Sequence, residues 1–323
     1  MTGLRITIPY SLYVLFFAAI LLGTGSAADV SGDIIIFHAG SLSVPLRAVA
    51  EAFEEEHEGT RVLREASGSR ISARKISDLG RPCDVMVSAD YVVIDSLLIP
   101  EHASWNIKFA GNEMVIAYRD ASRYSESIGN DNWHELLLRD DVAFGRSDPN
   151  ADPCGYRTVL TTKLAEAYYD IPGFSDALLR KDQRFMRPKE TDLLALLETQ
   201  TIDYIFIYRS VAMQHGLRYL VLPDAINLKC DEQADLYATA SVDISGAAPG
   251  TTITQIGEPM IYGVTVPHNA PNPDGALAFV SFLLQQDKGI AIMEANGQPG
   301  LVPSVSSTYH QIPEPLKDFT LRP

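Results

Sequence analysis

Short apolar runs alternate with segments in which apolar residues recur every three or four positions. In the first part of the chain, strands are predicted at Ile34–Phe37, Thr60–Arg64 and Asp84–Ser88. Helices are predicted at Pro45–His57 and Ser69–Leu79, with a third beginning at Tyr91. Because strands and helices alternate, this part of the chain predicts a parallel sheet covered by helices.

A second series of the same kind follows. Strands are predicted at Val142–Gly145 and Asp203–Tyr208, and helices at Gly155–Tyr169, Asp192–Glu198, Asp274–Leu284 and Lys288–Glu294. Two further apolar strands, Asn112–Arg119 and Glu258–Val266, bracket the middle of the chain. We interpret residues 112–118 and 258–266 as two connecting strands between two parallel-sheet lobes, the second inserted into the first. Residues 29–117 plus 260–323 then form lobe one, and residues 118–259 form lobe two.

The first 28 residues have the pattern of an export signal. Arg5 is followed by an apolar run from Tyr10 to Gly23 and then by the small residues Ser26, Ala27 and Ala28. An uncleaved membrane anchor is the alternative, but the run is shorter than the roughly 20 apolar residues that span a bilayer. We therefore expect an exported protein on the periplasmic or extracytoplasmic face of the membrane.

Charge and cysteine usage exclude several kinds of partner. The formal net charge of −15, from 41 acidic and 26 basic residues, argues against nucleic acid or an anionic membrane surface. Three cysteines, Cys83, Cys154 and Cys230, neither form a disulfide framework nor have the spacing of a zinc site. One pair among them remains possible as a bridge, and the sequence does not indicate which.

Four predicted helix starts carry residues that suit an anion. They are Gly40-Ser41, the stretch Ala66–Arg70 in which Ser69 opens a helix, Asp148–Arg157, and Arg187–Glu198. A helix start offers free N–H groups and about half a positive charge. Serine and aspartate are also ordinary helix caps, so each motif alone is better explained by capping. Together they follow strands in both lobes, where a parallel α/β fold binds its ligand.

No catalytic motif accompanies these helix starts. The chain contains no G-x-S-x-G, H-E-x-x-H or G-x-x-x-x-G-K-[ST] pattern. Cys154 has no evident base beside it, so an exported hydrolase is the weaker hypothesis. Tyr208 ends a strand that is predicted to be buried, and its hydroxyl is a candidate for the cleft. We expect a binding protein and not an enzyme.

Several segments resemble one family of binding proteins. They are "FHAGSL", "EASGSRISARKISDLGRPCDVMVSADY", "DPNADPCGYRT", "DYIFIYRSVAMQHGL" and "PMIYGVTVP". The chain resembles the tungstate/molybdate-binding proteins of ABC importers, in particular their archaeal-type branch, over nearly all of residues 33–305. The resemblance implies an α/β, two-lobe periplasmic-binding-protein-like fold of class II type, with the cleft closing on one oxyanion. It also implies a monomer that needs no cofactor and that delivers its ligand to an ABC permease.

The resemblance also assigns the ligand-binding residues. They are Gly40, Ser41, Ser69, Asp152, Pro153, Cys154, Glu190 and Tyr208. Asp152 and Glu190 would be carboxylate ligands of the metal in the oxyanion, and Cys154 would contribute its main-chain N–H. Glu198 is the alternative to Glu190 for the second carboxylate.

Two carboxylates are unexpected in a site for an anion. At close range in a poorly screened site they repel sulfate or phosphate by several kcal/mol. Tungsten(VI) and molybdenum(VI) are large, hard centres that take additional oxygen ligands, so carboxylates suit them. The pair would therefore exclude sulfate. A two-lobe receptor for another small anion, such as sulfate or phosphate, is the alternative, and the sequence does not separate tungstate from molybdate.

Overall fold

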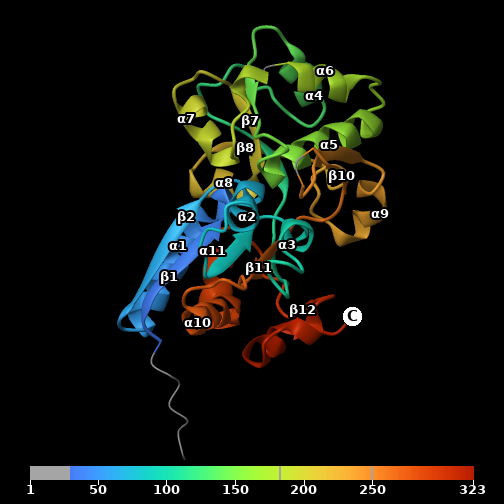
Figure 1. Ribbon diagram of the computed structural model, residues 1–323. Coiled ribbons are helices and arrows are strands. Elements are labelled where there is room, and N and C mark those ends of the chain that lie inside the picture. Colours follow the sequence, from blue (N-terminus) through green and yellow to red (C-terminus); the bar gives the residue numbers. More distant parts are fainter. Residues whose placement is uncertain (1–29, 182, 249) are drawn as a thin grey trace, which may run out of the picture.

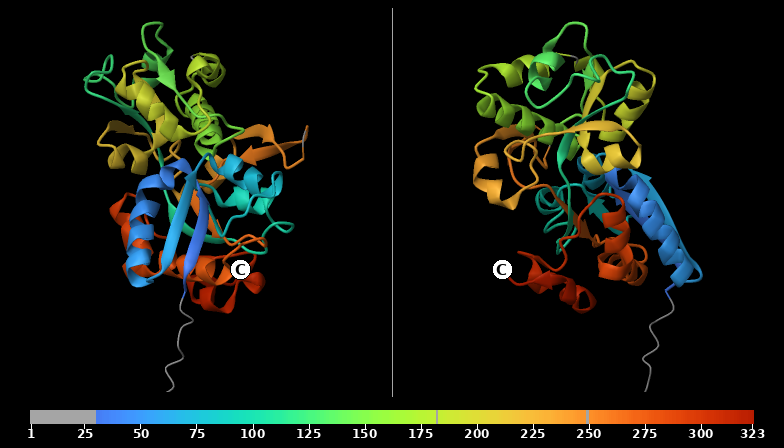
Figure 2. Two further views of the ribbon diagram at one scale, coloured as in Figure 1. Left: turned by 60° about the vertical axis from the view of Figure 1, so that its left-hand side comes forward. Right: turned by 180° about the vertical axis from the view of Figure 1, so that it is seen from behind.

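The computed structural model describes residues 30–181, 183–248 and 250–323, and it shows two lobes stacked one above the other (Figure 1). The predicted signal peptide, residues 1–28, lies outside these ranges. Each lobe has its own sheet with helices packed against it, and Figure 2 shows the same division from two further sides.

The lower lobe in Figure 1 contains a five-stranded sheet in the order β2-β1-β3-β11-β4. Its strands are β1 (Gly32–His38), β2 (Thr60–Ala66), β3 (Val85–Ser88), β4 (Ile107–Gly111) and β11 (Ile261–Thr265). Its helices are α1 (Ser43–Glu56), α2 (Ser69–Ser77), α3 (Tyr91–Leu97), α10 (Pro273–Leu284) and α11 (Ala291–Ala295). β1 pairs in parallel with β2 and β3, whereas β11 runs antiparallel to β3 and β4. The parallel pairing predicted for the first three strands is confirmed, whereas β11, predicted as a connecting strand, joins the sheet in the antiparallel direction.

The upper lobe contains a four-stranded sheet in the order β6-β7-β5-β8. Its strands are β5 (Met114–Tyr118), β6 (Phe144–Gly145), β7 (Tyr204–Tyr208) and β8 (Arg218–Val221). Its helices are α4 (Trp133–Leu138), α5 (Pro153–Tyr168), α6 (Phe174–Arg180), α7 (Leu193–Glu198) and α8 (Arg209–Gln214). β6 and β7 are parallel, but β5 is antiparallel to both β7 and β8. The two strands predicted for this lobe are thus parallel as expected, whereas β5, predicted as a connecting strand, makes the sheet mixed, because a buried apolar run does not encode the direction of its neighbours.

The connecting strands differ from their prediction. β5 and β11 are central members of the two sheets, so the chain crosses between lobes just before each of them. The first crossing is Asn112–Glu113, not a point after residue 117, and the second runs through Gly257–Met260. Residues 227 and 228 run beside both crossings, because the N–H of Met114 donates to Asn227 O and that of Met260 to Leu228 O. These short segments form the hinge.

The remaining elements lie at the edges of the lobes. They are α9 (Ala234–Tyr237), the hairpin of β9 (Ser241–Ser245) and β10 (Thr252–Ile256), which packs against α5 of the upper lobe, and the parallel pair β12 (Ser304–Val305) and β13 (Thr320–Leu321), which packs against β4 of the lower lobe. Within the described ranges, no single helix has the length and apolar character to cross a membrane; the bent pair Pro273–Leu284 and Gln286–Ala295 meets that test together. The thiols of Cys83, Cys154 and Cys230 are all free.

Candidate functional site

The turn after β1 places Ser41 at the junction of the two lobes. Residues Gly40–Leu42 form a 3-10 turn (η1) before α1, so Ser41 precedes the α-helix instead of lying in its first turn. Ser41 is buried, and its Oγ accepts a hydrogen bond of 3.2 Å from the hydroxyl of Tyr262. The Tyr262 hydroxyl in turn accepts from Nδ2 of Asn112, in the hinge, at 2.8 Å. The Ser41 proton is therefore free to donate to another acceptor.

Ser69 has a similar arrangement at the start of α2, shortly after β2 ends. Its side chain is fully buried, and its Oγ accepts a hydrogen bond of 3.0 Å from the N–H of Ala89. Ala89 follows β3 directly, so β2 and β3, the two strands that flank β1 in the lower sheet, bring these groups together. Like Ser41, Ser69 retains a proton for an external acceptor.

The two predicted carboxylates lie together in the upper lobe. Asp152 is the residue before the first turn of α5, which begins at Pro153, and Glu190 opens the short 3-10 turn Glu190–Asp192 (η3). The N–H of Glu190 donates to Oδ2 of Asp152 at 3.1 Å. Exposure is 1% for Asp152 and 0% for Glu190. Oδ1 of Asp152 and both Oε atoms of Glu190 accept no hydrogen bond from the described residues. A buried carboxylate without partners is costly, so these atoms are candidates for binding a ligand.

The protein environment of this pair favours protonation. Burial raises the pKa of Asp152, although the nearby side chains of Glu190 and Ser147 lower it in part. Burial, followed by the charge of Asp152, raises the pKa of Glu190 well above its ordinary value. Two carboxylates so close cannot both ionise without a compensating positive centre.

Cys154 and Tyr208 line the same region and stay protonated. Burial raises the pKa of the Cys154 thiol well above its ordinary value, which makes the thiol a poor nucleophile. The main-chain N–H of Cys154 lies close enough to Asp152 to lower the pKa of that carboxyl. Tyr208 ends β7, and its Oη accepts a hydrogen bond of 3.1 Å from Nη1 of Arg157. The Tyr208 proton is therefore also free to donate.

The two lobes meet at these residues. A Cβ placed on Gly40 of the lower lobe would lie 3.0 Å from each Oε of Glu190 and 2.9 Å from Oγ1 of Thr191. A Cβ placed on Gly68 would lie 2.3 Å from the main-chain oxygen of Ala151. The lobes are closed on each other, and glycine at both positions permits the close approach.

The structure thus brings the predicted residues of both lobes to one buried junction. Their binding role remains a prediction. Glu198, the alternative second carboxylate, is exposed at the end of α7. Sequence reasoning missed four residues that contact the site: Ser147, Arg157, Thr191 and Tyr262. For Ser147 a signal was present, because it follows β6 closely as Ser69 follows β2, and its side chain lies close enough to Asp152 to lower the pKa of that carboxyl.

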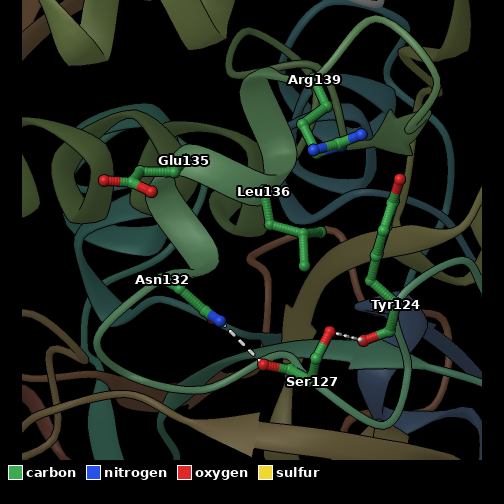
Figure 3. A pocket seen from close by; sticks show the side chains of 6 residues that line it. All are labelled: Tyr124, Ser127, Asn132, Glu135, Leu136 and Arg139. Carbon is green, nitrogen blue, oxygen red and sulfur yellow. Dashed lines mark hydrogen bonds between the residues drawn. The ribbon is translucent and has the colours of Figure 1, made fainter.

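A surface pocket of about 220 Å³ on the upper lobe lies apart from this site (Figure 3). It is lined by Tyr124, Ser127, Asn132, Glu135, Leu136 and Arg139. Three of its polar side chains already have partners: Ser127 Oγ donates to Tyr124 O, Asn132 Nδ2 donates to Ser127 O, and Arg139 pairs with Asp141. None of the predicted site residues lines it, so it is not the candidate site.

Comparisons with known sequences identify relatives along nearly the whole chain. A solute-binding protein of Petrotoga mobilis, described as uncharacterized, is 52% identical over 315 residues, which cover 96% of this chain and 95% of the relative. The molybdate/tungstate-binding protein WtpA of Pyrococcus abyssi is 40% identical over 344 residues, covering 98% of this chain and 97% of the relative.

Comparisons with solved structures concern the fold. The periplasmic molybdate-binding protein of Azotobacter vinelandii matches with a TM-score of 0.59 at 14% identity, covering 82% of this chain and 98% of that one. The sulfate-binding protein SubI of Mycobacterium tuberculosis matches with a TM-score of 0.59 at 13% identity, covering 83% and 87%. These likenesses confirm the predicted two-lobe, periplasmic-binding-protein-like α/β fold.

The sequence model of one family matches residues 34–298, which is most of the chain. Together with the full-length relatives, this match settles the assignment. The chain belongs to the family of bacterial extracellular solute-binding proteins.

Proposed function

We propose that this protein captures tungstate or molybdate outside the cytoplasm and delivers it to an ABC permease, acting as a monomeric carrier and not as an enzyme. The observation that carries the proposal is the buried pair Asp152 and Glu190, with three carboxylate oxygens that have no partner among the described residues. The resemblance to molybdate/tungstate-binding relatives supports the same ligand class.

The carboxylate pair selects against ordinary oxyanions. Sulfur and phosphorus in sulfate and phosphate do not add further oxygen ligands, so a sulfate placed here would meet two acids at close range. Tungsten(VI) and molybdenum(VI) accept additional hard oxygen donors, so Asp152 and Glu190 become ligands. Burial alone favours their protonated forms. A bound metal centre would supply the positive charge that stabilises both carboxylates in their ionised forms.

The hydroxyl groups complement the oxo atoms of the ligand. Ser41, Ser69 and Tyr208 each accept a hydrogen bond from a donor held by the protein: the Tyr262 hydroxyl, the Ala89 N–H and Arg157. With its acceptor role filled in this way, each hydroxyl directs its proton elsewhere. Three such donors suit an oxyanion. This preorganisation reduces the ordering cost of binding.

Lobe closure links binding to transport. The proposed ligand residues lie on both lobes. The lobes are joined by two short hinge segments, Asn112–Glu113 and Gly257–Met260. An anion that contacts both lobes stabilises the closed form, which is a hinge closure around a ligand. The closed form then presents a surface that a permease distinguishes from the open one.

Titration calorimetry with tungstate, molybdate and sulfate on the chain without its signal segment tests the proposal. We expect tungstate and molybdate to bind at least about 1,000-fold more tightly than sulfate, a difference of about 4 kcal/mol. Equal binding of sulfate, or sulfate binding that survives replacement of both acids by alanine, would establish the alternative receptor for another anion. Turnover of a substrate that disappears in Cys154→Ser would instead establish an enzyme.

A further inference from the structure

Arg157 is a buried cation that connects both lobes with the candidate site. It lies on α5 of the upper lobe and is 2% exposed. Its Nη1 donates to the main-chain oxygen of Ala89 in the lower lobe at 2.7 Å, and also to Oη of Tyr208 at 3.1 Å. Its Nη2 lies 3.1 Å from Oδ2 of Asp90, also in the lower lobe.

The contacts of Arg157 reach two of the proposed ligand hydroxyls. It donates directly to Tyr208. It reaches Ser69 through Ala89, whose oxygen accepts from Arg157 while its N–H donates to Oγ of Ser69. Tyr156, the neighbouring residue on α5, donates its hydroxyl to Asp90 Oδ2 at 2.6 Å. Residues 89 and 90 thus form the lower-lobe docking point for this end of α5.

We propose that Arg157 is a positioning residue that makes the Tyr208 hydroxyl a ligand donor only when the lobes are closed. This inference rests on the proposed function. The planar guanidinium bridges several fixed acceptors at once, which a single ammonium group does not do. Two of its partners, the hydrogen-bond acceptor Ala89 O and the ion-pair partner Asp90, belong to the opposite lobe, so opening removes them. Closure therefore fixes the orientation of the Arg157 guanidinium. The guanidinium then donates to one lone pair of the Tyr208 hydroxyl oxygen, and this fixes the direction in which the hydroxyl proton points.

Arg70 provides a matched control. It is also a buried arginine, 1% exposed, and it also bridges the lobes. Its Nε donates to Asn150 O at 3.2 Å, and its Nη2 donates to Ser245 O. These partners are main-chain oxygens of the upper lobe, and neither is a proposed ligand group. A residue that only fastens the lobes should behave like Arg70, whereas a residue that positions Tyr208 should not.

A double-mutant cycle for tungstate binding separates these roles. We expect Arg157→Met to weaken binding by about 100-fold and Tyr208→Phe by about 10-fold. In the double variant we expect no more than about a 2-fold further loss beyond Arg157→Met, because the two residues act as one unit. Arg70→Met should weaken binding less than Arg157→Met, and its effect should multiply with that of Tyr208→Phe.

Two outcomes overturn the inference. In one, the fold-losses of tungstate affinity caused by Arg157→Met and Tyr208→Phe multiply in the double variant. In the other, Arg70→Met and Arg157→Met cause equal losses of affinity, both in the unmodified protein and in Tyr208→Phe.

If Arg157→Met does not fold, as judged by circular dichroism, the same cycle is run with Arg157→Lys, which keeps the charge but loses the forked donor. The same coupling with Tyr208 is expected. Failure of the unmodified protein to bind tungstate would refute the proposed function itself, whereas binding without coupling refutes only the role of Arg157.

Discussion

The N–H of Glu190 donates to Oδ2 of Asp152 at 3.1 Å, while the remaining oxygen of Asp152 and both side-chain oxygens of Glu190 are buried without a partner among the described residues. The main chain thus holds two acids side by side, 38 positions apart in the sequence. Two buried acids at this distance are electrostatically unfavourable unless a positive centre lies beside them.

Replacing Asp152 with asparagine should remove a metal ligand without changing the size of the side chain. Because a neutral amide is a weaker donor to a hard metal centre, we expect tungstate affinity to fall by about 100-fold. The control is Asp192→Asn, since Asp192 lies on the same short turn as Glu190 but is 38% exposed and pairs with Lys189 at 3.4 Å. Calorimetry should show less than about a 2-fold change for the control. Equal losses in the two variants would contradict the assignment of Asp152.

Gly68→Ala should prevent closure without unfolding either lobe. The added Cβ would lie 2.3 Å from the main-chain oxygen of Ala151 and 2.9 Å from that of Pro188, both in the opposite lobe. Main-chain atoms do not move aside easily, so we expect at least about a 10-fold loss of tungstate affinity. Small-angle scattering should show that tungstate no longer contracts the molecule. Gly129→Ala is the control, because nothing lies within 4 Å of its added Cβ. Normal contraction of Gly68→Ala would show that this closed contact is not needed.

Tyr262→Phe should loosen Ser41 and its link to the hinge. The substitution removes the donor to Ser41 Oγ and leaves Nδ2 of Asn112 with one acceptor fewer. A buried hydrogen bond lost in this way costs about 1 to 2 kcal/mol, so we expect tungstate affinity to fall by about 10-fold. Tyr204→Phe is the control, since Tyr204 is a buried tyrosine on the same strand as Tyr208 that donates to Arg123 O. A comparable loss of affinity in both variants would mean that the effect is general destabilisation.

Glu258, in the second hinge segment, should make stability depend on pH. Burial, followed by the charge of Asp90, raises the pKa of Glu258 to about 7. The hydrogen bond from Tyr91 and the charges of Arg157 and Lys108 lower this pKa, but they do not cancel the increase. The folded state therefore favours the protonated acid. Its stabilising contribution is complete below pH 4.5 and is lost as pH rises through 7.

The free energy of unfolding should thus fall by about 2 to 3 kcal/mol between pH 4.5 and pH 8 through this group. Glu258→Gln, which is neutral throughout, should remove that part of the slope. Urea unfolding at a series of pH values measures the difference between the two proteins. Parallel profiles for both proteins would contradict a raised pKa at Glu258.

Local sequence signals identified the helix starts that carry site residues, but not the long-range hydrogen bonds that hold the hydroxyl groups of the site. Ser69 and Asp152 each stand at a helix start after a strand, so the pattern marks them, and the resemblance added Glu190. Arg157 and Tyr262 became visible only in the structure, because their partners lie 51 or more positions away or in the opposite lobe. The same limit explains the strand directions. The apolar run of β5 predicts burial, but it carries no signal for the antiparallel pairing with β7, which lies about 90 residues later in the chain.

X-ray absorption spectroscopy at the tungsten edge, on the protein saturated with tungstate, tests the central claim most directly. The account predicts six oxygen neighbours at more than one distance, and a return toward four in the variant with both Asp152→Asn and Glu190→Gln. Four equal tungsten–oxygen distances in the unmodified protein, as in the free ion, would show that neither acid binds the metal and would contradict the account.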